Sequence, residues 1–232
     1  MCEAMNTIHI LQHAPKEEPG LISEWAAVNN REIRTIHVYR NEELPDPESI
    51  PSLILLGGTM NIYQHRDHPW LIPEKQMLAR YVETGSSIFG ICLGGQLLAD
   101  VLGAKVTQNP VNEIGWFPVN FTSEARSYFP HLPESLTVLH WHGDTFALPK
   151  DSIRLAESEG CAEQGFLWNQ RILGLQFHPE ASPASIAQPA DRPVEEPSKF
   201  VQDISVRIAG YHRYSSQVKT VFFALLDTLF SR

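Results

Sequence analysis

The sequence has little cysteine, no long apolar run and no excess of positive charge. Only three of the 232 residues are cysteines (Cys2, Cys92 and Cys161). They lie far apart, which argues against a disulfide framework or a zinc site and favours a reducing compartment. No apolar run approaches the length that spans a bilayer. The first fifteen residues lack the basic start and apolar stretch of a signal peptide, so we expect a cytoplasmic protein that is not bound to a membrane.

The chain also has few positively charged residues. Lys and Arg number 18 against 27 Asp and Glu, which gives a formal net charge of -9 at pH 7. Nucleic acids and anionic membranes both require clustered Lys and Arg. Since the basic residues are scattered along this acidic chain, the sequence predicts no nucleic-acid partner and no membrane partner.

What the chain does contain is an alternation of short apolar segments with helical patterns. In the first half, strands are predicted at residues 7–12, 33–39, 53–56 and 86–91, and helices at 20–30, 74–83 and 93–102. This order predicts an α/β fold with a mainly parallel central sheet flanked by helices. The second half has strand candidates at 106–107, 115–121, 136–141, 153–156, 165–169 and 172–177. Few helices separate them, so this half should be more antiparallel.

The C-terminal part has a different composition. Residues 183–197 are polar and rich in proline, which predicts a linker. Apolar residues then recur at helical spacing: Val218, Val221, Phe222, Leu225, Leu226 and Leu229. Such a stripe forms either a helix packed on the core or a dimer interface, and we favour the first. We therefore expect one domain over residues 1–182, with residues 183–232 as a linker and a helical extension packed on it.

Cys92 stands between a predicted strand and a predicted helix. Gly90 and Gly94 flank it two positions away on either side. Glycine at these positions relieves crowding where a nucleophile sits on a sharp strand-to-helix turn. The helix N-terminus also favours the thiolate, which is the reactive form. The motif alone also fits a buried cysteine beside a glycine-rich turn, but the strand and helix around it favour a nucleophile.

A candidate base follows the last predicted strand, in Phe177-His178-Pro179-Glu180. A thiolate needs a group that returns a proton to the leaving group. Glu180 stands two residues after His178 and could hold the imidazole tautomer. The sequence therefore predicts that His178 and Glu180 act together.

Gly57-Gly58-Thr59-Met60 ends the apolar segment at residues 53–56. Two glycines allow backbone N–H groups to turn toward a developing oxyanion. A plain turn without a catalytic role is the alternative.

Taken together, Gly-Ile-Cys-Leu-Gly-Gly-Gln around Cys92 and Phe-His-Pro-Glu around His178 resemble the class I, or triad-type, glutamine amidotransferase family. Residues 57–63 resemble its oxyanion loop. Residues 113–115 and 142–144 resemble segments of the glutaminase domain of GMP synthase. The resemblance extends from about residue 8 to residue 180. It implies flavodoxin-like layers and an amidotransferase-like catalytic domain over residues 1–182.

The resemblance also implies a reaction, in which Cys92 attacks the side-chain amide of glutamine, or a related γ-glutamyl bond, and forms a γ-glutamyl thioester. His178 and Glu180 would complete the catalytic triad. The implied oxyanion donors are the backbone N–H groups of Gly58 and Leu93. The implied substrate-binding residues are Gln96 and, more weakly, Glu113, His142 and Asp144, for which a structural role is the alternative. No metal and no cofactor are implied.

The sequence departs from the family pattern in two ways, and the second leaves the use of the released ammonia open. Thr59 stands where many relatives have proline, which keeps the backbone donors in place. The residues after Glu180 are too few for a synthetase domain, so we expect a stand-alone hydrolase. The alternatives are a γ-glutamyl peptidase and a glutaminase subunit that delivers ammonia to a separate synthetase partner. A catalytically silent regulator is disfavoured because all three triad residue types are present.

Overall fold

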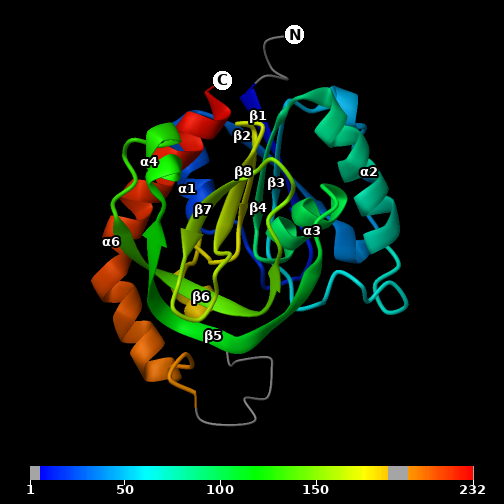
Figure 1. Cartoon of the computed structure of the whole chain (residues 1–232). Helices are drawn as coiled ribbons and strands as arrows, with labels where there is room; N and C mark the ends of the chain where they lie inside the picture. Colours follow the sequence, from blue (N-terminus) through cyan, green and yellow to red (C-terminus); the bar gives the residue numbers. More distant parts are fainter. Residues whose placement is uncertain (1–5, 188–197, 232) are drawn as a thin grey trace.

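The computed structural model describes residues 6–187 and 198–231 (Figure 1). The elements, in chain order, are β1 (Thr7–Gln12), α1 (Leu21–Val28), β2 (Glu32–His37), the 3-10 turns η2 (Val38–Arg40) and η3 (Pro47–Ser49), β3 (Ser52–Leu55), α2 (Leu71–Thr84), β4 (Ser87–Ile91), α3 (Leu93–Val101), β5 (Val106–Phe121), α4 (Ser123–Tyr128), β6 (Ser135–Phe146), β7 (Ile153–Glu157), β8 (Gly165–Trp168), β9 (Ile172–Leu175), α5 (Pro183–Ile186) and α6 (Ile204–Phe230).

Within the described residues, nine strands form one sheet in the order β2-β1-β3-β4-β9-β8-β7-β5-β6. The pairings from β2 to β9 are parallel. Those from β9 to β6 are antiparallel. The predicted α/β fold, with its more antiparallel second half, is therefore confirmed. The parallel strands β1, β3, β4 and β9 all end at the same edge of the sheet, which is where open α/β sheets bind their ligands.

Helices cover both faces of the sheet, as Figure 1 shows for α1 and α6 on one side and α2 and α3 on the other. Side chains of β1 alternate between the two faces because successive residues of a strand point in opposite directions. Ile8 and Ile10 share a core cluster with Trp25 of α1 and Phe222 of α6. Leu11 belongs to a second cluster, which contains residues of α2 and α3.

Several elements differ from the sequence-based expectation in length. The segments expected at 106–107 and 115–121 form one strand, β5, whose register with β6 shifts between Gln108 and Glu113. The final helix begins at Ile204, well before the apolar stripe. The short helices α4 and α5 were not predicted, and α5 lies in the expected linker. The rest of that linker, residues 188–197, lies outside the described residues.

The apolar stripe of α6 packs against the sheet. Val218, Phe222, Leu225 and Leu229 are buried in the cluster that contains β1. This is the packing expected from the sequence. The division of the chain at residue 182 stays a prediction.

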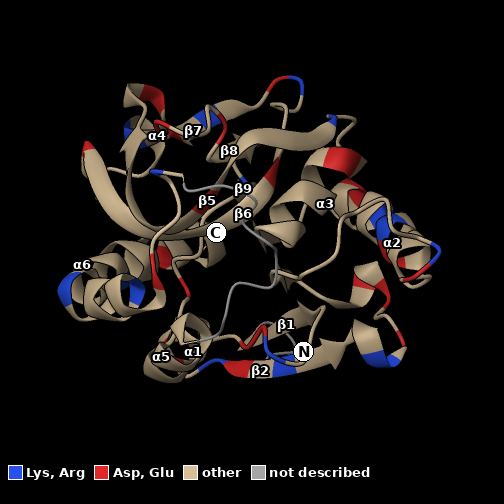
Figure 2. Ribbon diagram, turned by 90° about the horizontal axis from the view of Figure 1, so that it is seen from below, with Lys and Arg blue, Asp and Glu red and all other residues tan. Residues whose placement is uncertain are grey.

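Lys and Arg are interspersed with Asp and Glu, and α2, α6 and β2 each contribute basic residues (Figure 2). In this view no single element collects the positive charge. Among the described residues, no helix combines the length and the apolar character needed to cross a membrane.

Candidate active site

Cys92 occupies the turn between β4 and α3 in a strained backbone conformation, with φ at 50°. A positive φ is costly for a residue with a Cβ, and such strain clusters at functional sites. Both flanking glycines are required by close packing. A Cβ on Gly90 would lie 2.5 Å from the backbone of Gly94, and one on Gly94 would lie 2.4 Å from the carbonyl oxygen of Leu55. The turn therefore has the geometry that the sequence predicted for a nucleophile.

The sulfur of Cys92 has a buried amide beside it. Cys92 is 7% exposed, and Nε2 of Gln176 donates to Sγ at 3.6 Å. Gln96 in turn donates to Oε1 of Gln176 at 3.1 Å. The sulfur of Cys92 thus lies against a chain of two buried amides. The sequence did not lead us to predict Gln176 as a site residue. Its position, a polar residue directly after an apolar strand, could have indicated it.

His178 and Glu180 form a hydrogen-bonded pair, with Nδ1 of His178 2.7 Å from Oε1 of Glu180. Burial lowers the pKa of His178, but the Glu180 carboxylate and the Cys92 sulfur outweigh it and hold that pKa well above its ordinary value. The imidazolium form of His178 is thus favoured beside the sulfur of Cys92. The backbone also fixes this segment, because the N–H of His178 donates to Leu139 and that of Leu21 donates to Glu180.

A cavity of about 600 Å³ joins these groups. The predicted site residues that line it are Cys92, His178, Glu180, Gly58, Gln96, His142 and Asp144. Leu93 and Glu113 do not line it, although Leu93 directly follows the nucleophile at the start of α3. Asn61, in the loop after β3, donates to Oδ2 of the lining residue Asp144 at 2.6 Å.

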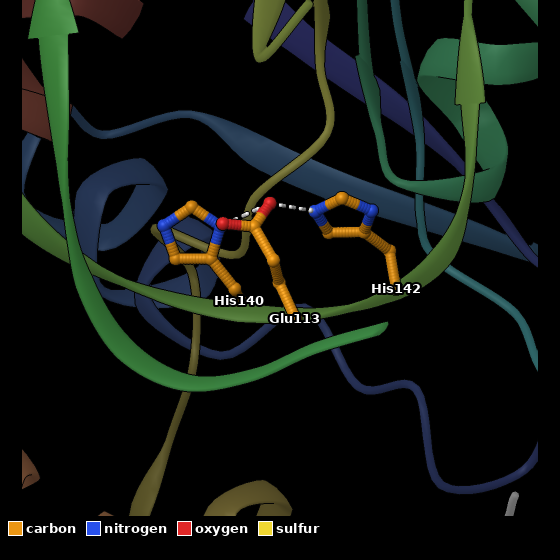
Figure 3. Close-up of side chains that lie close together, drawn as sticks. All are labelled: Glu113, His140 and His142. Carbon is orange, nitrogen blue, oxygen red and sulfur yellow. Dashed lines mark ion pairs between the residues drawn. The ribbon is translucent and has the colours of Figure 1, made fainter. Parts of the chain in front are cut away.

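Glu113 lies behind His142, between two imidazole rings (Figure 3). Its Oε2 is 3.1 Å from Nε2 of His142 and 3.6 Å from Nδ1 of His140. Burial raises the pKa of Glu113, but hydrogen bonds from both histidines outweigh it and keep the pKa below its usual range. The second nitrogen of His142 bonds the carbonyl oxygen of Asp144 at 3.0 Å. Glu113 therefore supports a wall of the cavity from outside it.

The residue types and closeness of Glu113, His140 and His142 would suit a metal ion. The position between them is filled, however, by the side-chain amide of Gln164. Its Nε2 lies 2.7 Å from Oε2 of Glu113, 3.3 Å from Nδ1 of His140 and 3.5 Å from Nε2 of His142. A metal ion would have to displace this amide. We therefore interpret the cluster as a buried hydrogen-bond network.

Both the sequence and the fold of this chain are similar to those of known proteins. Residues 24–189 match the family described as "Glutamine amidotransferase class-I". The glutamine amidotransferase-like protein YfeJ of Salmonella typhimurium is 32% identical over 179 residues, which is 75% of each chain. A glutamine amidotransferase structure from Thermotoga maritima superposes with a TM-score of 0.87 at 30% identity and covers 97% of this chain and 98% of its own.

The chain belongs to the class I glutamine amidotransferase family. GMP synthase of Aliivibrio fischeri is 30% identical over 169 residues, which is 69% of this chain but 31% of that enzyme. The span matched to the amidotransferase family contains Cys92, His178 and Glu180. The residues of β1, the loop that follows it and α6 lie outside that span.

Proposed function

We propose that this amidotransferase-family protein hydrolyses a γ-glutamyl C–N bond through a γ-glutamyl thioester on Cys92. One observation carries the proposal. The sulfur of a strained strand-to-helix turn shares a single cavity with a hydrogen-bonded His178–Glu180 pair. A nucleophile, a base and a group that orients the base are the parts that covalent catalysis requires.

The proposed reaction runs in two steps. Sγ of Cys92 attacks the γ-carbonyl carbon, and the negative charge on its oxygen is held by the backbone N–H groups of Gly58 and Leu93. The C–N bond then breaks, and the nitrogen leaves with a proton from His178. A water molecule next gives its proton to His178 and adds to the thioester. The C–S bond breaks, which releases glutamate and restores the Cys92 thiolate beside protonated His178.

The size and the charged rim of the cavity favour a γ-glutamyl peptide as a second candidate substrate. A volume near 600 Å³ lies in the range of sites for ligands larger than one amino acid. Lys16, Glu17 and Glu18 line part of the cavity beside the triad. They supply both signs of charge, which suits the amino and carboxyl groups of a peptide.

A synthetase partner is the third candidate, because the matched GMP synthase is longer than its matched region. For all three candidate functions we expect a reducing compartment such as the cytoplasm, because oxidation inactivates a cysteine nucleophile.

A hydrolysis panel separates these reactions. The purified chain is incubated with glutamine, glutathione and several γ-glutamyl dipeptides, and ammonia, free amino acid and glutamate are measured. Ammonia from glutamine supports a glutaminase, and release of amino acids from peptides alone supports a peptidase. Glutaminase activity that appears only with an added synthetase supports a partner-dependent subunit. No release from any substrate, with or without a synthetase, would contradict the proposal.

A further inference from the structure

A second buried histidine–glutamate pair lies behind the glycine loop that follows β3. His13 follows β1 and Glu74 lies in the first turn of α2. Both are 0% exposed, and Nε2 of His13 is 2.8 Å from Oε1 of Glu74. The other ring nitrogen of His13, Nδ1, lies 2.9 Å from the carbonyl oxygen of Leu56 and 3.2 Å from that of Gly57. Neither His13 nor Glu74 lines the cavity, and the mechanism above uses neither.

The partners of the His13 ring determine where its protons lie. Carbonyl oxygens only accept hydrogen bonds, so Nδ1 carries a hydrogen and donates. A proton also lies between Nε2 and Glu74, since a bare imidazole nitrogen would otherwise face a carboxylate in a fully buried place. Burial lowers the pKa of His13, but Glu74 and the two carbonyl oxygens outweigh it and raise that pKa above its ordinary value. Glu74 therefore keeps the Nδ1 donor of His13 aimed at the loop.

One of the two carbonyls that His13 contacts, that of Gly57, belongs to the peptide unit of a proposed oxyanion donor. The C=O of Gly57 and the N–H of Gly58 lie in one planar trans peptide and point in opposite directions. A donor that holds this carbonyl on one side therefore directs the N–H of Gly58 to the other side. It also polarises the peptide, which makes the N–H a stronger donor.

Close packing keeps this arrangement in place. The ring of Trp70 stacks on His13, with centroids 5.7 Å apart and planes 24° apart. A Cβ on Gly58 would lie 2.6 Å from side-chain atoms of Leu93 and Met60 and 3.2 Å from Cβ of His13. The glycine loop is thus confined between His13 and the start of α3. The Gly57–Gly58 peptide therefore has little room to rotate.

We infer that His13 and Glu74 are a positioning pair that aims the N–H of Gly58 at the tetrahedral intermediate formed on Cys92. The inference rests on the proposed function. His13 touches neither substrate nor sulfur and acts through the Gly57–Gly58 peptide. His13 also precedes residues 24–189, so the family match does not cover it.

The test compares two probes of Cys92 in the full chain. An aldehyde analogue of glutamate forms a tetrahedral adduct on the sulfur and needs the oxyanion donors. Iodoacetamide alkylates the sulfur without forming an oxyanion, so it reports the thiolate alone.

The double variant His13→Leu/Glu74→Leu removes the pair and leaves no unpaired charge, a replacement that buried ion pairs often tolerate. Glu74→Gln retains a neutral imidazole that still donates from Nδ1. Tyr81→Phe, a buried change near the far end of α2, is the matched control.

In the double variant, we expect kcat on the γ-glutamyl substrate and affinity for the aldehyde to fall about tenfold to a hundredfold, approaching the loss of one oxyanion donor. KM and the iodoacetamide rate should stay near the wild-type values. Glu74→Gln should keep most of the activity, and Tyr81→Phe all of it.

A folded double variant with full kcat would overturn the inference, as would equal losses with both probes, because a merely structural role weakens both. If the double variant unfolds, the variant His13→Phe/Glu74→Gln takes its place, because it keeps the side-chain sizes. The same measurements on that variant then support or overturn the inference. A folded wild-type chain that forms no aldehyde adduct on Cys92 would instead overturn the proposed function, and the inference with it.

Discussion

Two cysteines in the described part of the chain are buried to a similar degree, but their surroundings differ. Cys92 is 7% and Cys161 is 4% exposed. Burial raises the pKa of Cys161, whose sulfur lies 3.2 Å from the hydroxyl of Thr145. Cys92 instead begins a helix and faces a histidine whose pKa is raised. Burial disfavours a thiolate in general, whereas a helix N-terminus and a neighbouring imidazolium favour one. We therefore expect Cys92, and not Cys161, to react with electrophiles.

The first prediction is that Cys92→Ser abolishes labelling by a γ-glutamyl-like electrophile such as a diazo-ketone analogue of glutamine. Serine has a similar shape, but its hydroxyl forms little alkoxide near neutral pH. Cys161→Ser is the matched control and should label like the wild type. Mass spectrometry of the digested protein locates the adduct, and an adduct on Cys161 with Cys92 free would refute the assignment.

The second prediction concerns the pH profile. The Glu180 carboxylate raises the pKa of His178, so neutralising it in Glu180→Gln should lower that pKa. The active form pairs a thiolate with an imidazolium, and activity at high pH is lost when His178 deprotonates. The alkaline limb of kcat/KM should therefore move to lower pH in Glu180→Gln. His178→Ala should lose more activity at every pH because it removes the proton carrier itself. An alkaline limb that does not move would mean that Glu180 does not act on His178.

That Cys92, His178 and Glu180 meet at one cavity could be predicted from the sequence, because each of them belongs to a short local motif. His178 and Glu180 are two positions apart, and the glycines that Cys92 needs are two positions away on either side. The His13–Glu74 pair could not be predicted, since its members are 61 positions apart and meet only through the packing of α2 on the sheet. For Glu113, the sequence suggested a pocket residue, and only the fold shows that it lies behind His142.

At the scale of elements, periodic segments were predicted well and irregular ones were not. The limits of β1 were predicted at residues 7–12, as observed, because it is short, apolar and clearly bounded. The middle of β5 was missed because Asn109, Pro110 and Asn112 are typical of turns, and the structure accommodates them at a register shift. The first half of α6 was missed because exposed apolar residues such as Val206 obscure its amphipathic pattern.

The third prediction concerns the start of α1, which holds the backbone of Glu180. Gly20 has φ at +50°, and a Cβ there would lie 2.0 Å from the carbonyl oxygen of Glu180. Gly20→Ala should therefore lower the free energy of unfolding by more than about 2 kcal/mol, which exceeds the cost of the backbone conformation alone. It should also reduce kcat, because Glu180 has to shift.

Gly103→Ala is the matched control. Gly103 also has a positive φ, at +83°, but no atom lies within 4 Å of its added Cβ. This change should cost only about 1 kcal/mol in urea unfolding and leave kcat unchanged. Equal effects of the two substitutions would show that the contact with Glu180 is unimportant.

At the scale of the whole molecule, α6 connects the C-terminal part of the chain to its N-terminal half. Asp227 of α6 accepts a hydrogen bond from the indole N–H of Trp25 at 2.8 Å. The carbonyl oxygen of Phe230 accepts one from Arg31 at 2.9 Å, and that of Leu229 accepts one from Ser87 at 3.1 Å. These polar contacts lie at the C-terminal end of the apolar stripe on the same helix. The stripe covers the sheet face that β1 shares with α1, so we expect α6 to be needed for the fold of the domain that carries the site.

The last prediction tests this role of α6 against the alternative of a docking face. The ring of Phe222 is 2% exposed and packs on Phe89 of β4 with centroids 5.8 Å apart. Phe222→Asp places an unpaired charge in that core and should unfold the chain, since its cost of several kcal/mol is comparable to the total stability of a typical domain. Val206→Asp, on the same helix at a position that is 48% exposed, should leave the fold intact. Circular dichroism with size-exclusion chromatography measures both outcomes. A folded, monomeric Phe222→Asp protein from an oligomeric parent would show that the stripe joins two chains, whereas loss of helical signal in that variant alone would show that α6 completes the core of its own chain.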